Sequence, residues 1–134
     1  MRLLVDTGVF SAALNDRRRH PEFEPLVARL PGNQLNLAAQ TVAELRYGAL
    51  VAGWAESRRD RLERAIAATT VIQVSDALLT TVARLRFDCR TMGHTLASAA
   101  HNGDLWIAAT ALHVQARLVT ADHIFDQVPG LMVN

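Results

Sequence analysis

The sequence is poor in cysteine and in lysine. Its single cysteine, Cys89, excludes an internal disulfide framework and fits a reducing compartment such as the cytoplasm. All fourteen basic residues are arginines, and the thirteen acidic residues leave a net charge of +1. No strong overall positive field therefore indicates a nucleic-acid ligand, although arginine suits the recognition of phosphate and carboxylate groups.

Long apolar runs are also missing. No stretch is long enough to span a membrane, and Asp6 interrupts the first residues too early for a signal peptide. We therefore expect a cytoplasmic protein with no membrane partner. Half of the residues are hydrophobic and 20% are charged, which is ordinary for a globular protein, and a length of 134 residues predicts one domain over residues 1–134.

Several motifs of well-known enzyme classes are absent. The chain has neither the glycine-rich fingerprint of dinucleotide-binding domains nor the phosphate-binding loop of nucleotide triphosphatases. It also lacks a serine or cysteine nucleophile with recognisable histidine and aspartate partners. His94 and His101 have no other histidine or cysteine at metal-ligand spacing, so we interpret them as loop or surface residues.

Short apolar segments alternate with amphipathic or apolar segments of helical length. The former predict strands at 3–5, 35–37, 71–74 and 117–120, with a possible edge strand at 131–133. The latter predict helices at 9–14, 22–30, 41–54, 55–69, 75–92 and 102–112. This alternation favours an α/β fold with a parallel sheet.

The segment from Asn102 to Leu112 predicts a helix that is apolar on nearly every side and therefore buried. Its one charge, Asp104, lies in the first turn, where the helix dipole favours an anion. The simplest interpretation is that Asn102 or Asp104 caps the helix. Asp104 is also one of four acidic residues at the edges of apolar segments, and a parallel sheet could bring all four together.

The other three acids each have a structural interpretation as well. Asp6 directly follows the first expected strand and could simply cap the next helix, while Asp122 follows the last strand. Thr41 and Glu44 match the spacing of a capping box. The carboxyl ends of strands are, however, where open α/β sheets place their functional sites.

The helix expected after Glu44 has two further features of note. Gly48 lies within it, which predicts the close approach of another backbone. The following segment is rich in charge, and its spacings predict an exposed helix face with the ion pairs Glu56–Arg59 and Asp60–Arg64.

Four carboxylates in one pocket repel one another and must be protonated, separated or neutralised by cations. Oxygen ligands alone suit Mg²⁺ or Mn²⁺, which also bind substrate phosphate. Such ions can activate water and stabilise the charge that develops during phosphodiester hydrolysis. The residues alone therefore make metal-dependent phosphodiester hydrolysis a plausible chemistry.

Four segments in order resemble the PIN-domain ribonucleases, specifically the VapC-type toxins of bacterial toxin–antitoxin pairs, and residues 125–131 resemble the ending of that family. The four segments are Leu4–Thr7, Thr41–Leu45, Asp104–Ala109 and Leu118–Asp122. The resemblance implies a three-layer fold with a central parallel sheet flanked by helices. It also implies a Mg²⁺-dependent endoribonuclease, usually a homodimer, that a small cognate antitoxin protein inhibits.

Carried over residue by residue, the resemblance assigns the catalytic and metal-binding acids to Asp6, Glu44, Asp104 and Asp122, with Thr120 as a nearby hydroxyl. The chain departs from the family pattern at two positions. Gly8 and Gly103 each stand where asparagine is common, and both changes bear on how the neighbouring carboxylates are positioned.

Two alternatives remain open at this stage. A PIN-like binding module would use the same acids as helix caps, whereas a phosphatase would need a second aspartate two residues after the first, and Gly8 stands there. For RNA binding we expect arginines beside the acidic pocket, at Arg17, Arg18, Arg19 and Arg46. Whether Asp126 assists the site is not decided by the sequence.

Overall fold

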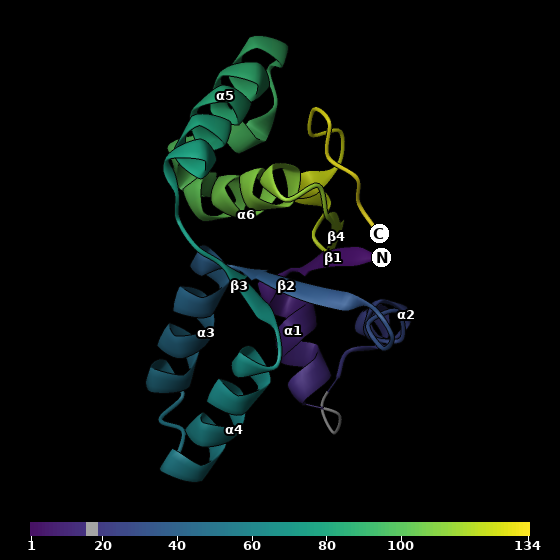
Figure 1. The fold of residues 1–134 in the computed structure, drawn as a ribbon, viewed down its shortest axis with the longest axis vertical. Helices are drawn as coiled ribbons and strands as arrows, with labels where there is room; N and C mark the ends of the chain where they lie inside the picture. The colour runs from purple at the N-terminus through teal and green to yellow at the C-terminus, as the bar shows by residue number, and fades with distance from the viewer. Residues whose placement is uncertain (16–18) are drawn as a thin grey trace.

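The computed structural model describes residues 1–15 and 19–134 and contains a four-stranded parallel sheet in the order β3-β2-β1-β4 (Figure 1). The strands are β1 Arg2–Val5, β2 Gln34–Ala38, β3 Thr70–Ile72 and β4 Arg117–Val119. Leu4 in β1 lies opposite Asn36 on one side and Leu118 on the other. The predicted parallel α/β architecture and its four strands are confirmed.

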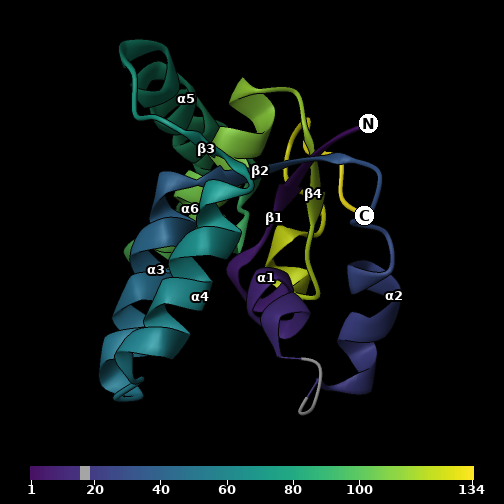
Figure 2. The same ribbon diagram turned by 60° about the horizontal axis from the view of Figure 1, so that its bottom comes forward.

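Helices cover both faces of the sheet and create three layers (Figure 1). On one face lie α5 and α6; on the other lie α1, α3 and α4, while α2 packs beside α1 (Figure 2). The bounds are α1 Thr7–Leu14, α2 Glu24–Val27, α3 Ala39–Val51, α4 Glu56–Ala67, α5 Asp76–Met92 and α6 Asn102–His113. Short 3₁₀ helices lie at Pro21–Phe23 (η2), Thr95–Ala97 (η3), Ala99–His101 (η4) and His123–Phe125 (η5).

Alternate residues of the central strand supply two separate hydrophobic cores. The side chain of Leu4 joins the cluster formed with α5 and α6, whereas Leu3 and Val5 join the cluster formed with α1, α3 and α4. Strand β1 is buried on both faces, as its continuous apolar run predicts. Asp6 therefore leaves the sheet at a point that is fixed by packing on both sides.

Helix α6 is buried, as its composition predicts. Leu105, Ala108 and Ala109 have no solvent exposure, and α6 packs between α5 and the sheet (Figure 1). Ser75 caps α5 as expected, since its hydroxyl accepts a hydrogen bond from the backbone N–H of Leu78. No helix in the two described ranges is long and apolar enough to cross a membrane.

Several details differ from the predictions. The single helix expected over residues 22–30 is the 3₁₀ turn η2 followed by the four-residue helix α2, because Pro25 has no N–H to donate to the preceding turn. Strand β3 ends at Ile72 rather than Val74. The edge strand expected at 131–133 is reduced to an isolated parallel bridge between Val133 and Leu118.

The predictions for α3 and α4 were also partly wrong. No atom of the described residues outside α3 lies within 4 Å of the position that a Cβ atom of Gly48 would occupy, so the predicted close approach of another backbone is not seen there. In the described part of the chain, the ion pair of α4 joins Glu63 to Arg46 of α3, and the expected pairs Glu56–Arg59 and Asp60–Arg64 are not formed. The Glu63–Arg46 pair links two helices that lie side by side (Figure 2).

Candidate active site

Asp6 lies where β1 ends and α1 begins. Its backbone N–H donates to the carbonyl of Val119, the last residue of the neighbouring strand β4. Its carboxylate caps α1: Oδ1 accepts from the Thr7 backbone N–H at 2.8 Å. Oδ2 accepts from the Thr120 hydroxyl at 2.6 Å. The predicted cap is therefore confirmed, and a second hydrogen bond fixes the carboxylate against β4.

Glu44 reaches the same region from α3. This helix begins at Ala39, and its N-cap, Ala38, makes no side-chain capping hydrogen bond, so the predicted Thr41–Glu44 capping box is wrong. The Thr7 hydroxyl instead donates to Glu44 Oε1 at 3.3 Å and also lies 3.2 Å from the Thr41 hydroxyl. Glu44 therefore takes no part in capping α3, the structural role that its sequence context suggested.

Asp104 is the third residue of α6. The N-cap position belongs to His101, which makes no capping hydrogen bond, so neither Asn102 nor Asp104 caps the helix as expected. Asp104 Oδ2 lies 3.4 Å from His101 Nδ1. The carboxamide of Asn102 instead accepts a hydrogen bond from Arg86 of α5, which anchors the start of α6.

Asp122 is the most exposed of the four acids. It caps the 3₁₀ helix η5 by accepting from the Ile124 backbone N–H at 2.9 Å. Its own backbone N–H donates to the Thr120 hydroxyl at 3.0 Å, and that hydroxyl donates to Asp6. One threonine therefore connects the two acids that follow β1 and β4.

Thr120 is itself held by Asn134, a contact that sequence reasoning missed. The Asn134 carboxamide accepts from the Thr120 backbone N–H and donates to the Thr120 carbonyl, both at 2.9 Å. His101 is a second residue that was missed, because it was interpreted as a loop or surface residue without a functional partner. His94 is a loop residue, as expected. Its Nδ1 accepts a hydrogen bond from the Leu96 backbone N–H, and its Nε2 lies 2.8 Å from the backbone carbonyl oxygen of Asp126.

The carboxylates influence one another electrostatically. Burial is the main reason why the pKa of Asp6 is raised above its ordinary value, and the charges of Asp104 and Asp122 raise it further, against hydrogen bonds from Thr120 and Thr7. Burial also raises the pKa of Glu44, with added repulsion from Asp6 and Asp104. Electrostatic repulsion thus links Asp6 to Asp104 and Asp122, and Glu44 to Asp6 and Asp104.

The four acids do not converge on one point. Among residues 1–15 and 19–134, no three aspartate, glutamate, histidine or cysteine side chains lie close enough together to form a ready set of metal ligands. An ion held by this arrangement would need side-chain rotation or bridging waters, and Mg²⁺ usually retains several waters in proteins.

The arginines expected beside the pocket are mostly engaged elsewhere. Arg19 donates to the carbonyl of Ala12 and pairs with Glu24, while Arg46 makes a two-pronged contact with Glu63. Arg17 and Arg18 lie outside the described residues. Asp126 pairs with His123 at 3.0 Å on the surface, and among residues 1–15 and 19–134 no hydrogen bond or ion pair joins its carboxylate to the four acids.

The chain was compared with known proteins. The sequence model of the PIN domain family matches residues 3–131, a range that includes all four acids. Over 110 residues the chain is 36% identical to ribonuclease VapC8 of Mycobacterium tuberculosis (strain CDC 1551 / Oshkosh), which covers 81% of this chain and 88% of the relative.

Solved structures share the fold. A chain in the crystal structure of VapBC2 from Rickettsia felis, bound to a DNA fragment from their promoter, superposes with a TM-score of 0.80 at 23% identity and covers 100% of this chain and 98% of its own. A chain of VapBC-5 from Mycobacterium tuberculosis, a member of the VapBC family of toxin–antitoxin systems, gives a TM-score of 0.66 at 26% identity, covering 98% and 93%. These likenesses extend over nearly the whole chain.

Proposed function

Because the chain belongs to the PIN domain family, we propose that it is a VapC-type toxin, an endoribonuclease that hydrolyses RNA phosphodiester bonds with the help of a divalent cation. The observation that supports this most strongly is the mutual repulsion of four acids from separate segments. Asp6 and Asp122 follow the neighbouring strands β1 and β4, Glu44 comes from α3 and Asp104 from α6. The identity with a ribonuclease over most of the chain supports the same substrate class.

The donor chemistry of these residues fits Mg²⁺ or Mn²⁺. All four side chains offer carboxylate oxygens. Burial chiefly raises the pKa of Asp6 and of Glu44, and repulsion from neighbouring carboxylates raises it further; a bound cation would offset that repulsion. We propose that all four acids hold the metal, directly or through water. The chemistry that the cation supplies is Lewis-acid activation of water and of the phosphodiester.

The chain's own residues do the positioning. Thr7 and Thr120 each bind carboxylates, so they hold Glu44 and Asp6 in fixed orientations at the edge of the sheet. Asn134 fixes the backbone of Thr120 through hydrogen bonds to its N–H and its carbonyl. Indirect contacts of this kind commonly change the activity of metal sites by about 10- to 100-fold.

We further propose that a cognate antitoxin protein binds and inhibits this chain and that the chain forms a homodimer. The structural relatives support the partner, because they are chains of VapBC structures, one of which is a member of the VapBC family of toxin–antitoxin systems. The adjacent reading frame of the source genome should encode a small antitoxin-like protein.

The proposed function is tested by expressing the chain in a bacterial host with and without that neighbouring protein. Expression of the parent alone should arrest growth and fragment RNA, and coexpression of the neighbour should restore growth. A parent chain that neither slows growth nor alters RNA would favour the alternative of a PIN-like binding module.

Glu44→Gln is expected to lower metal-dependent RNA cleavage by about 10- to 100-fold. Glutamine keeps an oxygen that can accept from the Thr7 hydroxyl, and no capping box is present to be disturbed, so the melting temperature should change little. Steady-state cleavage of a labelled RNA at saturating Mg²⁺ measures the effect. A variant as active as the parent would mean that Glu44 is structural and that the site has three acids.

Asn134→Ala is expected to lower cleavage about tenfold, because Thr120 loses both hydrogen bonds that hold its backbone. The free energy of unfolding should fall by about 1–3 kcal/mol. Asn33→Ala is a matched control, since Asn33 also donates to a backbone carbonyl, that of Arg29. If the two variants cleave at the same rate per folded molecule, Asn134 has no positioning role.

A further inference from the structure

A cleft of about 760 Å³ leads away from the candidate active site between α1, α3 and α4. Its inner end includes Thr7 and Glu44, and its outer end includes Trp54, Arg58 and Arg61. This volume lies within the range of pockets that bind small organic ligands. The cleft therefore has room for a group of that size beside Glu44, which lines it, and beside Thr7, the residue that follows Asp6.

The two ends of the cleft carry opposite charge. Arg61 donates to the carbonyl of Leu14 at 2.8 Å, and the guanidinium of Arg58 lies 3.9 Å from the centre of the Trp54 ring. Among the described residues, the contacts of Arg58 and Arg61 are with an aromatic ring and a backbone carbonyl, and neither contact neutralises a positive charge. A ligand with anionic groups at regular spacing suits such a cleft. One anionic group would bind the divalent cation proposed at the acids, and the next would bind an arginine at the outer end.

Trp54 and Arg58 together present a stacking surface. Trp54 is half-buried against the core of α1, α3 and α4, and Arg58 is exposed. Unpaired nucleobases are commonly recognised by stacking on aromatic rings and on guanidinium planes, whereas paired bases inside a duplex cannot reach such surfaces.

Gly48 lines the cleft between its two ends. Its backbone does not need glycine, because it lies inside α3, and a Cβ atom there would meet nothing within 4 Å. Any side chain at this position would project into open space. The glycine therefore keeps the cleft open without serving the packing of the fold.

Building on the ribonuclease function proposed above, we propose that this cleft holds one unpaired nucleotide of the RNA next to the phosphodiester that is cut. The base contacts the Trp54–Arg58 pair, and the phosphate contacts Arg61 and Arg58. Trp54, Arg58 and Arg61 thus determine how the nucleotide that flanks the cleavage site is bound.

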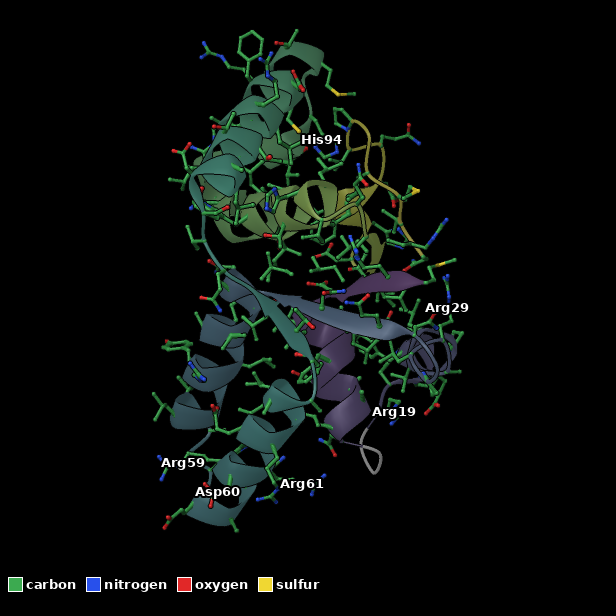
Figure 3. The ribbon with its side chains drawn as sticks, in the orientation of Figure 1. Arg19, Arg29, Arg59, Asp60, Arg61 and His94 are labelled. Carbon is green, nitrogen blue, oxygen red and sulfur yellow. The ribbon has the colours of Figure 1, made fainter. Side chains whose placement is uncertain are left out.

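The helix α4 offers a matched control for the arginines. Arg59 and Arg61 project from opposite sides of α4, with Arg61 on the side of α1 (Figure 3). Arg59 lines a separate depression on the outer side, together with Arg46 and Leu50. Arg59→Gln therefore removes the same charge from the same helix without changing the cleft.

The test measures binding of a short, labelled, single-stranded oligoribonucleotide pool by fluorescence anisotropy, with Ca²⁺ in place of Mg²⁺ to slow cleavage. Arg58→Gln and Arg61→Gln should each weaken binding about three- to tenfold and lower the log–log salt slope by about 0.7. Arg59→Gln should stay within about twofold of the parent, and an RNA duplex should compete poorly.

Gly48→Leu tests the cleft without changing any charge and without weakening the fold. Leucine has a higher helix propensity than glycine, so the melting temperature should stay the same or rise. Because its side chain fills the cleft, binding of the single-stranded pool should weaken by about tenfold or more.

The outcomes separate this proposal from the one it builds on. A parent that binds and cleaves RNA while Gly48→Leu, Arg58→Gln and Arg61→Gln behave like Arg59→Gln would overturn the cleft proposal alone. A parent that neither binds nor cleaves RNA would overturn both proposals. If these variants instead weaken binding of the partner protein and leave RNA binding unchanged, the cleft is a protein-docking site and the proposal is wrong.

Discussion

The Asp104→Asn variant is expected to lose metal-dependent RNA cleavage by at least about two orders of magnitude while keeping the parent's melting temperature within a few degrees. The substitution removes a proposed metal ligand and a negative charge. A catalytic metal contributes several kcal/mol of transition-state stabilisation, and each 1.36 kcal/mol is about tenfold in rate. The melting temperature should change little because Asp104 does not cap α6, and its described side-chain contact is with His101 at 3.4 Å. Single-turnover cleavage and thermal unfolding measure the two effects.

Asp76→Asn is the control for this variant. Asp76 is also an acid in the first turn of a helix, α5, but it is exposed and is not one of the four proposed site acids. It should cleave RNA at the parent's rate. An Asp104→Asn protein that is as active as Asp76→Asn would show that Asp104 is no ligand.

Asp6→Asn is expected to abolish cleavage and, in addition, to change how metal and pH affect stability. The pKa of Asp6 in the folded, metal-free protein is raised, chiefly by burial and further by Asp104 and Asp122. Protonation of Asp6 therefore stabilises the folded state: this contribution is fully present below the unfolded pKa near 3.8 and is lost as the pH rises through the raised folded pKa. At neutral pH the ionised carboxylate opposes folding unless a cation is bound.

Two measurements follow for Asp6→Asn. In EDTA, the unfolding free energy of the parent relative to the variant should increase as the pH is lowered toward the unfolded pKa of Asp6. At pH 7, Mg²⁺ should raise the melting temperature of the parent, since a ligand at one hundred times its Kd stabilises by about 2.7 kcal/mol, and it should raise that of the variant much less. Equal responses of the two proteins to Mg²⁺ and to pH would exclude Asp6 from the metal site.

The fold was predictable because its signals are local and repeated. The continuous apolar run of Leu3 to Val5 predicts a strand buried on both faces, and the nearly all-apolar segment after Asp104 predicts a buried helix. Once the strands are parallel and β1 neighbours β4, Asp6 and Asp122 must lie at the same edge of the sheet. The order of the four acids in the family pattern supplied the rest of the candidate site.

The capping motifs were misjudged because sequence spacing does not fix where a helix begins. Thr41 and Glu44 fit a capping box, yet α3 starts at Ala39, where no side-chain cap marks the boundary. Because Glu44 does not cap α3, its carboxylate is available for the proposed metal site. Asn134 and His101 could not be found in the sequence, since their partners are set by tertiary contacts at the sheet edge and at the start of α6.

The positions of the α4 arginines relative to a buried leucine were visible in the sequence but were not used. The dense charge of residues 55–69 predicted an exposed face with internal ion pairs. Arg58, Arg61 and Leu62 are spaced i, i+3 and i+4, however, and Leu62 is buried, so this side of the helix faces α1 and α3. A test of which arginines share a face with a core residue would have pointed to the cleft.

The central claim, metal-dependent ribonuclease activity at the four acids, is tested most directly by incubating purified parent protein with end-labelled bacterial RNA in Mg²⁺ and in EDTA. We predict discrete fragments in Mg²⁺, intact RNA in EDTA, and restoration of cleavage when Mg²⁺ is added back in excess. Cleavage of equal extent in EDTA, or intact RNA in Mg²⁺ and Mn²⁺ alike, would contradict the account.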